Sequence, residues 1–159
     1  MARSGHECKA TEITQERGQR WVSEHPNLSW GISDGIHLDR FEPEGWYDVV
    51  ISNQVVEHMH PDDLLAHLRG VSLILREGGI YMFATPHAYV GPTDVSRIFK
   101  RDTTMDMHLK EYTYSEMKGY LKRAGFKDIY AVLRLPAKYH KVTDNALGPK
   151  LRLYPKTSA

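Results

Sequence analysis

The hydrophobic and polar positions along the chain follow two different periods. Residues 49–51, Val-Val-Ile, are three β-branched residues in a row, which predicts a strand buried on both faces, as in a parallel sheet covered by helices. Between residues 61 and 76, apolar residues recur at spacings of three and four, which predicts one amphipathic helix. We expect this helix to end at Gly78-Gly79 and to connect two adjacent parallel strands, 49–52 and 80–84.

Comparable patterns predict the remaining elements. Thr113 and Glu116 form a capping box at the start of a helical pattern that Gly125 ends. Because strands alternate with helices, we predict an α/β fold, a three-layer sandwich with a mostly parallel sheet. Additional strands are expected at 8–13, 28–32 and 129–135, with 151–154 as a further candidate, and additional helices at 15–24 and 114–124.

Composition narrows the range of functions. The 159 residues fit one domain, and 21 Lys+Arg against 20 Asp+Glu give no general basic field for nucleic acid. The single cysteine, Cys8, excludes an internal disulfide framework and fits a reducing compartment, so we expect a cytoplasmic protein. No apolar run approaches ~20 residues, so we expect no membrane span.

Five stretches follow one another in a distinctive order. They are TEIT at 11–14, SDG at 33–35, YDVVISNQVVEHMHP at 47–61, LREGGIYMFATP at 75–86 and HLKEYTYSEMKGYLKRAGF at 108–126. This ordered set resembles the class I S-adenosylmethionine-dependent methyltransferases of the small-molecule type. The resemblance implies a Rossmann-like sheet, S-adenosylmethionine as the cofactor and methyl transfer to a small-molecule acceptor.

The resemblance also implies where the cofactor lies. Glu12 corresponds to the acid that holds the ribose hydroxyls, and Asp34 to the acid against the adenine amino group. Asn53 lies beside the methionine part of the cofactor. Each residue has an ordinary alternative: a solvated acid for Glu12, an Asp-Gly turn for Asp34 and a turn or strand end for Asn53. The expected cofactor-binding set is Glu12, Ile13, Asp34, Gly35, Asn53 and Gln54.

Two residues after the strand at 49–52 are candidates for catalysis. Methyl transfer from a sulfonium needs an acceptor held in line and, for a protonated acceptor, a base. His58 suits that base and Glu57 is the second candidate, although a loop histidine is more often only hydrogen-bonded or solvated. His58 and His60 raise the question of a metal. We expect none, because no further Cys or His stands at ligand spacing.

The acceptor is expected to contact residues after the strand at 80–84. His87 follows that strand, and His108 and Tyr112 lie just before the helix at 114–124. The long polar segment 89–107 runs between them, and long loops in compact domains are often functional. The alternative is a plain surface loop.

The chain departs from the family at its start. A first strand and a glycine-rich loop of the GxGxG kind should precede residues 5–14, and only four residues do. That strand would lie between the strands at 8–13 and 49–52, so without it both expose unpaired backbone groups. We therefore expect an N-terminally truncated sheet, with edges that pair with another chain or segment, a homo-oligomer included. We also expect weak or no binding of S-adenosylmethionine.

Two functions remain open for the methyltransferase-like domain that we expect at 1–135, before a C-terminal strand or tail at 136–159. The first is an incomplete catalytic domain of a small-molecule methyltransferase. The second is a non-catalytic, methyltransferase-like module for binding or scaffolding. The cofactor acids favour the first function, and the absent glycine-rich loop favours the second.

Overall fold

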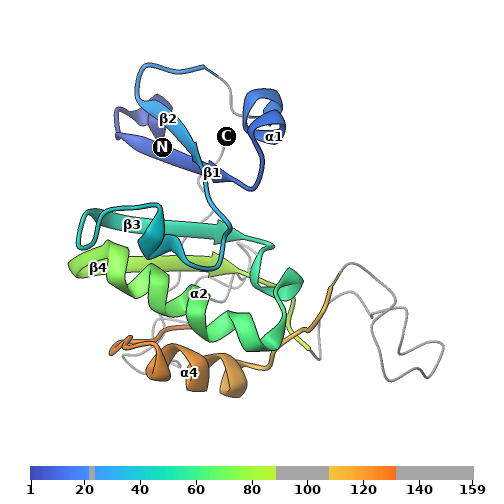
Figure 1. Ribbon diagram of the computed structural model, residues 1–159. Helices are drawn as coiled ribbons and strands as arrows, with labels where there is room; N and C mark the ends of the chain where they lie inside the picture. The colour runs from blue at the N-terminus through green and yellow to red at the C-terminus, as the bar shows by residue number, and fades with distance from the viewer. Residues whose placement is uncertain (22–23, 89–107, 132–159) are drawn as a thin grey trace, which may run out of the picture. The chain divides into compact units, whose positions relative to one another are not determined.

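The computed structural model describes residues 1–21, 24–88 and 108–131 (Figure 1). Its first compact unit is Met1–Gly125, and the structure describes only 126–131 of the second, Phe126–Ala159. The expected domain boundary at 135 lies outside the described residues. The elements are η1 (Ala2–Ser4), β1 (Cys8–Glu12), α1 (Gln15–Trp21), β2 (Leu28–Ile32), η2 (Leu38–Arg40), β3 (Tyr47–Asn53), η3 (Val56–His58), α2 (Pro61–Ile74), β4 (Leu75–Ala84) and α4 (Tyr114–Arg123).

The strands β3 and β4 are adjacent and parallel, with α2 between them in the chain (Figure 1). Val49 pairs with Ile80 and Asn53 pairs with Ala84. This confirms the predicted parallel neighbours. The predicted end of the helix was wrong, because α2 ends at Ile74 and Gly78-Gly79 lies within β4. The pairing register shifts between Tyr47 and Val49, so the glycines form an irregularity in the strand instead of a helix stop.

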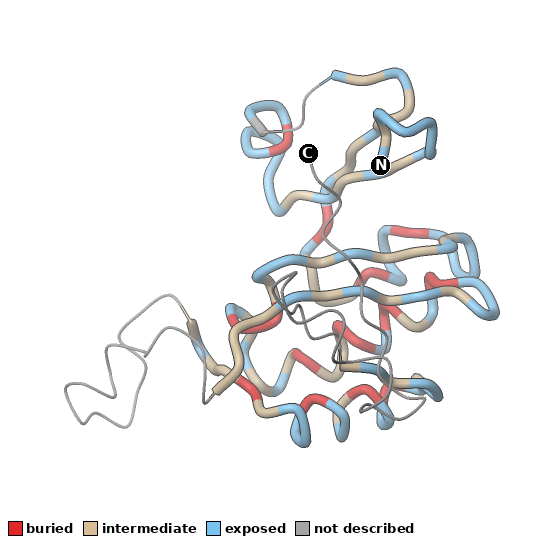
Figure 2. The backbone as a smooth tube through the Cα atoms, turned by 180° about the vertical axis from the view of Figure 1, so that it is seen from behind, coloured by how far each residue is buried: buried red, intermediate tan, exposed pale blue. Residues whose placement is uncertain are grey.

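The core of this region lies between α2, α4 and one face of the β3–β4 pair. Leu64, Leu68 and Val71 on α2 are completely buried, and Figure 2 shows buried positions following both helices. The other face of the strands is open, since Ile51, Ile80 and Met82 are 52%, 56% and 47% exposed. Burial of the 49–51 strand on both faces is therefore not what the described chain shows.

The strands β1 and β2 form a second parallel pair, from Cys8 opposite Leu28 to Glu12 opposite Ile32. The helix α1 packs on this pair through Gly18, where an added Cβ would lie 2.2 Å from the Trp30 ring. Contact this close requires glycine, which explains a helix-weakening residue in the middle of α1.

The helix α4 begins and ends as predicted. Thr113 and Glu116 form the reciprocal capping box, and Gly125 follows the helix with a φ of 102°. Residues 129–131 of the strand expected at 129–135 contain no strand, and the rest of it lies outside the described residues, as does 151–154.

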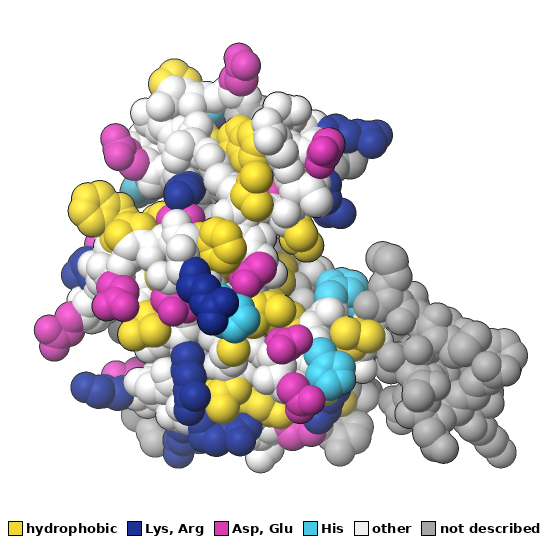
Figure 3. All heavy atoms as spheres, in the orientation of Figure 1, with side chains coloured by type: hydrophobic (Ala, Val, Ile, Leu, Met, Phe, Trp, Pro, Cys, Tyr) yellow, Lys and Arg dark blue, Asp and Glu magenta, His cyan; other side chains and the backbone are white. Residues whose placement is uncertain are grey.

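The described part is thus a mixed α/β structure with two separate parallel pairs, β1–β2 and β3–β4, instead of one continuous sheet. None of its helices is long and apolar enough to cross a membrane. Figure 3 shows acidic and basic side chains together over the visible face, as the balanced composition predicts.

Candidate functional site

The expected cofactor acid Glu12 ends β1 and is only partly exposed. Its Oε2 accepts a hydrogen bond from Arg17 Nε at 3.3 Å, and its backbone carbonyl accepts one from Ser33 N at 3.0 Å. The second bond joins the carboxyl ends of β1 and β2, which is the edge where ligands bind in open α/β sheets. Ile13, beside Glu12, is exposed.

Asp34, after β2, organises its own turn. Its Oδ1 accepts hydrogen bonds from Ile36 N at 2.8 Å and His37 N at 2.7 Å, and its Oδ2 lies 2.9 Å from His37 Nδ1. Burial raises the pKa of Asp34, but the hydrogen bonds from His37 and Ile36 outweigh it and lower the pKa. Gly35 follows with a φ of 73°. The turn alternative for Asp34 is thus present in the structure.

The backbone after β3 is strained. Gln54 has a φ of 53° and is the one non-glycine residue of the described chain in the left-handed region. Its amide donates to Ala84 O at 2.9 Å, which ties it to the end of β4. Strain of this kind persists only where surrounding contacts enforce it, and it clusters at functional sites. Asn53 is exposed at the end of β3.

Glu57 is fully buried in η3, directly after this strained turn. Thr85 Oγ1, at the end of β4, donates to Glu57 Oε2 at 3.0 Å. The Glu57 backbone carbonyl accepts from Leu109 N at 2.7 Å and Lys110 N at 3.2 Å. One residue therefore connects the ends of β3 and β4 to the segment that precedes α4.

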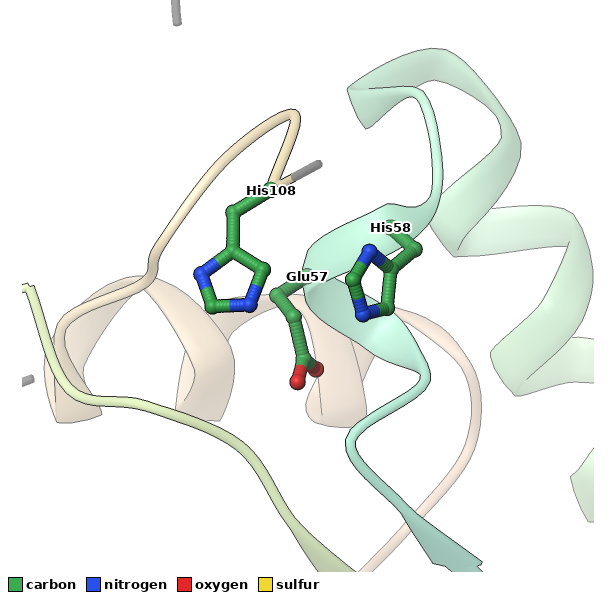
Figure 4. Close-up of side chains that lie close together, drawn as sticks. All are labelled: Glu57, His58 and His108. Atoms are coloured by element: carbon green, nitrogen blue, oxygen red, sulfur yellow. The ribbon is translucent and has the colours of Figure 1, made fainter. Parts of the chain in front are cut away.

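Three of the predicted site residues meet at this point: Glu57, His58 and His108 (Figure 4). The rings of His58 and His108 pack edge to face with centroids 4.9 Å apart, and Figure 4 shows the Glu57 carboxylate between them. Glu111 Oε1 lies 3.3 Å from His108 Nδ1. From the sequence, Glu57 and His58 were expected to act in catalysis and His108 to contact the acceptor. The fold places all three residues in one cluster.

His87 and Tyr112, the other expected acceptor contacts, form a bridge with parallel backbone pairing. His87 Nε2 accepts from Tyr114 N at 3.3 Å, and the rings of His87 and Tyr114 lie 4.6 Å apart. Burial, together with the neighbouring Tyr120 and Glu116, raises the pKa of Tyr112 to about 12. These contacts anchor the start of α4 beside the end of β4.

A buried polar network was missed from the sequence. His67 Nδ1 lies 2.7 Å from Gly35 O, His67 Nε2 lies 3.2 Å from Tyr81 Oη, and Tyr81 Oη lies 2.7 Å from Ser52 Oγ. A carbonyl only accepts, so Nδ1 carries the proton, Tyr81 donates to Nε2 and Ser52 donates to Tyr81. Burial lowers the pKa of His67 and raises that of Tyr81 to about 12. The only available signal was a histidine within the apolar face of the helix at 61–76.

The comparisons with known proteins agree with this architecture. A family model described as a methyltransferase domain matches residues 3–131. No curated protein sequence matches the chain. Among solved structures, the chain is similar to an S-adenosylmethionine-dependent methyltransferase from Archaeoglobus fulgidus, with a TM-score of 0.60 and 17% identity, covering 82% of this chain and 56% of that one.

Two further structures share the fold. A 1,6-didemethyltoxoflavin N1-methyltransferase from Burkholderia thailandensis, bound to 1,6-didemethyltoxoflavin and S-adenosylhomocysteine, has a TM-score of 0.59 and 17% identity, covering 84% of this chain and 56% of that one. PigF with S-adenosylhomocysteine has a TM-score of 0.57 and 18% identity, covering 79% and 43%. The chain thus spans about half the length of these structures. Because the family match covers most of the sequence, the chain belongs to the methyltransferase domain family.

Proposed function

We propose that this chain forms the cofactor- and acceptor-facing part of an S-adenosylmethionine-dependent methyltransferase that acts on a small molecule. The observation that carries the proposal is the strained turn at Gln54, which delivers the buried Glu57 and the exposed His58 to the carboxyl ends of β3 and β4. Ligands of open α/β sheets bind at such ends. Backbone strain there is consistent with a preorganised site rather than a passive loop.

The proposed cofactor contacts lie at the ends of the two parallel pairs. Glu12 would hold the ribose and Asp34 the adenine, with Ile13 and Gly35 beside them. Asn53 and Gln54 would face the methionine part. Both acids are already engaged in the structure, Glu12 with Arg17 and Asp34 with its own turn. A ligand must therefore compete with existing hydrogen bonds, which reduces the net gain from each new one.

The proposed acceptor site lies around His58, with His87, His108 and Tyr112 as contacts. A small molecule is favoured by the near-zero net charge, formally +1, which offers no field for a nucleic acid. The Burkholderia neighbour, by its name, acts on a small molecule. In this proposal His58 is the candidate base, and the fully buried Glu57 helps to position the cluster.

Binding of S-adenosylhomocysteine to the chain tests the cofactor proposal. We expect weak binding, with a dissociation constant of roughly 1 mM, or about −4 kcal/mol. Saturation-transfer NMR at millimolar ligand measures it. The Glu12→Gln substitution should abolish the signal of the ribose protons, while Glu16→Gln, on the exposed side of α1, should not change it.

Absence of any ligand signal in the unaltered chain would overturn cofactor binding by this chain. It would instead support the second function, a non-catalytic module of the methyltransferase family. One observation favours that module: both oxygens of Asp34 are occupied by its own turn. Micromolar binding that Glu12→Gln leaves unchanged would show that the cofactor lies elsewhere.

Assembly through strand edges is part of the same proposal. In the described chain β1 pairs only with β2, and β3 only with β4, which leaves one edge of each strand open. Ile51, Ile80 and Met82 are also exposed, on the open face of the β3–β4 pair. We expect a dimer or larger species by light scattering. A monomer at high concentration would contradict this. The free Cys8 supports a reducing compartment, and we propose the cytoplasm.

A further inference from the structure

The cluster of Glu57, His58 and His108 has the composition of a metal site. Each residue offers one ligand atom, and these atoms lie within 4.8 Å of one another. One carboxylate and two imidazoles are the protein ligands of several zinc enzymes, in which a fourth position remains open. Sequence spacing did not reveal the set, because His108 follows His58 only after the whole of α2 and β4.

The backbone holds the three residues together independently of their side chains. Glu57 and His58 are consecutive in η3. The Glu57 carbonyl accepts the amide protons of Leu109 and Lys110, which fixes the segment that begins with His108. Main-chain hydrogen bonds therefore bring together the two segments that carry the three ligand groups.

The Glu57 carboxylate lacks part of its expected bonding. The side chain is completely buried, yet only Oε2 has a hydrogen-bond donor, Thr85, whereas Oε1 has none among the described residues. A buried carboxylate oxygen without a donor is costly. A cation at the cluster would supply the missing interaction.

His108 is oriented as a metal ligand usually is. Its Nδ1 faces Glu111 Oε1 at 3.3 Å, and both side chains are largely buried, at 18% and 13% exposure. Metal-binding histidines commonly donate their second N–H to a carboxylate, which fixes the tautomer and leaves the other nitrogen for the ion. In His108 that nitrogen is Nε2.

We propose that Glu57, His58 and His108 bind a divalent first-row transition ion such as Zn²⁺, with Glu111 as a positioning residue. Ligand atoms of a tetrahedral zinc ion lie about 3.4 Å apart, given bonds of roughly 2.0–2.2 Å. The ligand atoms of the cluster, which lie within 4.8 Å of one another, would have to move closer together around the ion. The imidazole ligands favour a transition ion over Mg²⁺ or Ca²⁺, which prefer oxygen.

The ion would change the chemistry proposed for this site. A ligand His58 could not act as base, but an acceptor hydroxyl at the open position of the ion would lose its proton more readily. This consequence rests on the proposed function. Ion binding itself does not, because it requires neither cofactor nor acceptor.

Calorimetry with ZnCl₂ on the full chain, in a buffer free of chelators, tests the proposal. We expect one tight site, and a loss of affinity for His58→Ala and His108→Ala larger than for Glu111→Gln, which should lose about 10–100-fold. His60→Asn is the matched control, since His60 lies two positions from His58, caps α2 through Asp62 N and is outside the cluster. Asparagine retains the cap. MgCl₂ should give no binding.

Circular dichroism without zinc distinguishes a loss of zinc binding from a loss of fold. The spectra of His58→Ala, His108→Ala and His60→Asn should match that of the unaltered chain. These variants avoid the buried Glu57, the substitution of which endangers folding. The proposal is overturned if Zn²⁺ does not bind, if His58→Ala and His108→Ala bind as the unaltered chain does, or if His60→Asn loses as much affinity as they do. If the chain did not bind the cofactor, the proposal of a metal site would still stand.

Discussion

The two parallel strand pairs of this chain are built from similar parts but bury very different amounts of apolar surface. Every buried hydrophobic residue of the described chain lies between Leu38 and Ala124, in the region of β3, β4, α2 and α4. Among the residues whose burial is described, the region of β1, β2 and α1 contributes none. It depends instead on the fit of Trp30 against Gly18 and on polar contacts such as Lys9 with the buried Glu42.

This difference shows which region contributes most of the hydrophobic burial that stabilises the fold. Hydrophobic burial is the main favourable contribution to folding, so the β3–β4 region should open only with global unfolding. The β1–β2 region, with few buried contacts, should open at lower free energy. The proposed ribose and adenine acids lie in or directly after this weaker pair, so cofactor binding would stabilise it most.

The largest effect is expected from truncation of the core. Leu68→Ala removes a completely buried side chain between α2 and its neighbours, and it should lower the free energy of unfolding by about 2–5 kcal/mol. Ile32→Ala, at the end of β2, is the counterpart in the weaker region, and with 48% exposure it should cost less than about 1 kcal/mol. Urea unfolding measures both. Equal losses would contradict the comparison.

The next effect comes from two helical glycines. A Cβ at Gly18 would clash with the Trp30 ring, so Gly18→Ala should cost roughly 1–3 kcal/mol. Gly119 in α4 has nothing within 4 Å of an added Cβ, so Gly119→Ala should raise stability by up to about 1 kcal/mol. Thermal unfolding measures the change. A gain for both variants would show that Trp30 does not rest on Gly18.

The elements of the fold could largely be predicted because local signals specify them. The capping box at Thr113 and the run at 49–51 define their own helix and strand. The start of β4 could not be predicted, because Gly78-Gly79 is a helix stop by local rules and only pairing with β3 makes it part of a strand. The open face at Ile51 could not be predicted either, since a β-branched run indicates burial but not what covers it.

The candidate site was only partly predictable for the same reason. Glu57 and His58 follow a strand directly, so their position at a strand end was sufficient to make them candidates. The contact of His108 with these two residues depends on hydrogen bonds between segments that are distant in the sequence, and no local sequence pattern predicts such bonds. His67 carries no local signal of its role, because a histidine on an apolar helix face reads as a core residue until its partners are known.

The pH dependence of stability tests the buried network in the more stable region. Burial lowers the pKa of His67 below its unfolded value, so the unfolded state binds the proton first. Stability should be constant above about pH 6.5 and should fall with acidification below it, by at most about 1.4 kcal/mol per pH unit from this group. Urea unfolding across this range checks it. In His67→Gln the fall should be shallower, and an unchanged slope would assign the effect to other groups.

The smallest effect is expected at the strained turn, and it links stability to function. Gln54 adopts a φ of 53°, which costs a non-glycine residue roughly 1 kcal/mol relative to glycine. Gln54→Gly should therefore raise stability by up to about 1 kcal/mol, because Gln54 is exposed and its amide bond to Ala84 O remains. Gln54→Ala keeps the strain and should leave stability nearly unchanged. Urea unfolding distinguishes the two substitutions. If Gln54→Gly did not stabilise the chain, the left-handed turn would not be a store of strain, and the main support for a preorganised site after β3 would be lost.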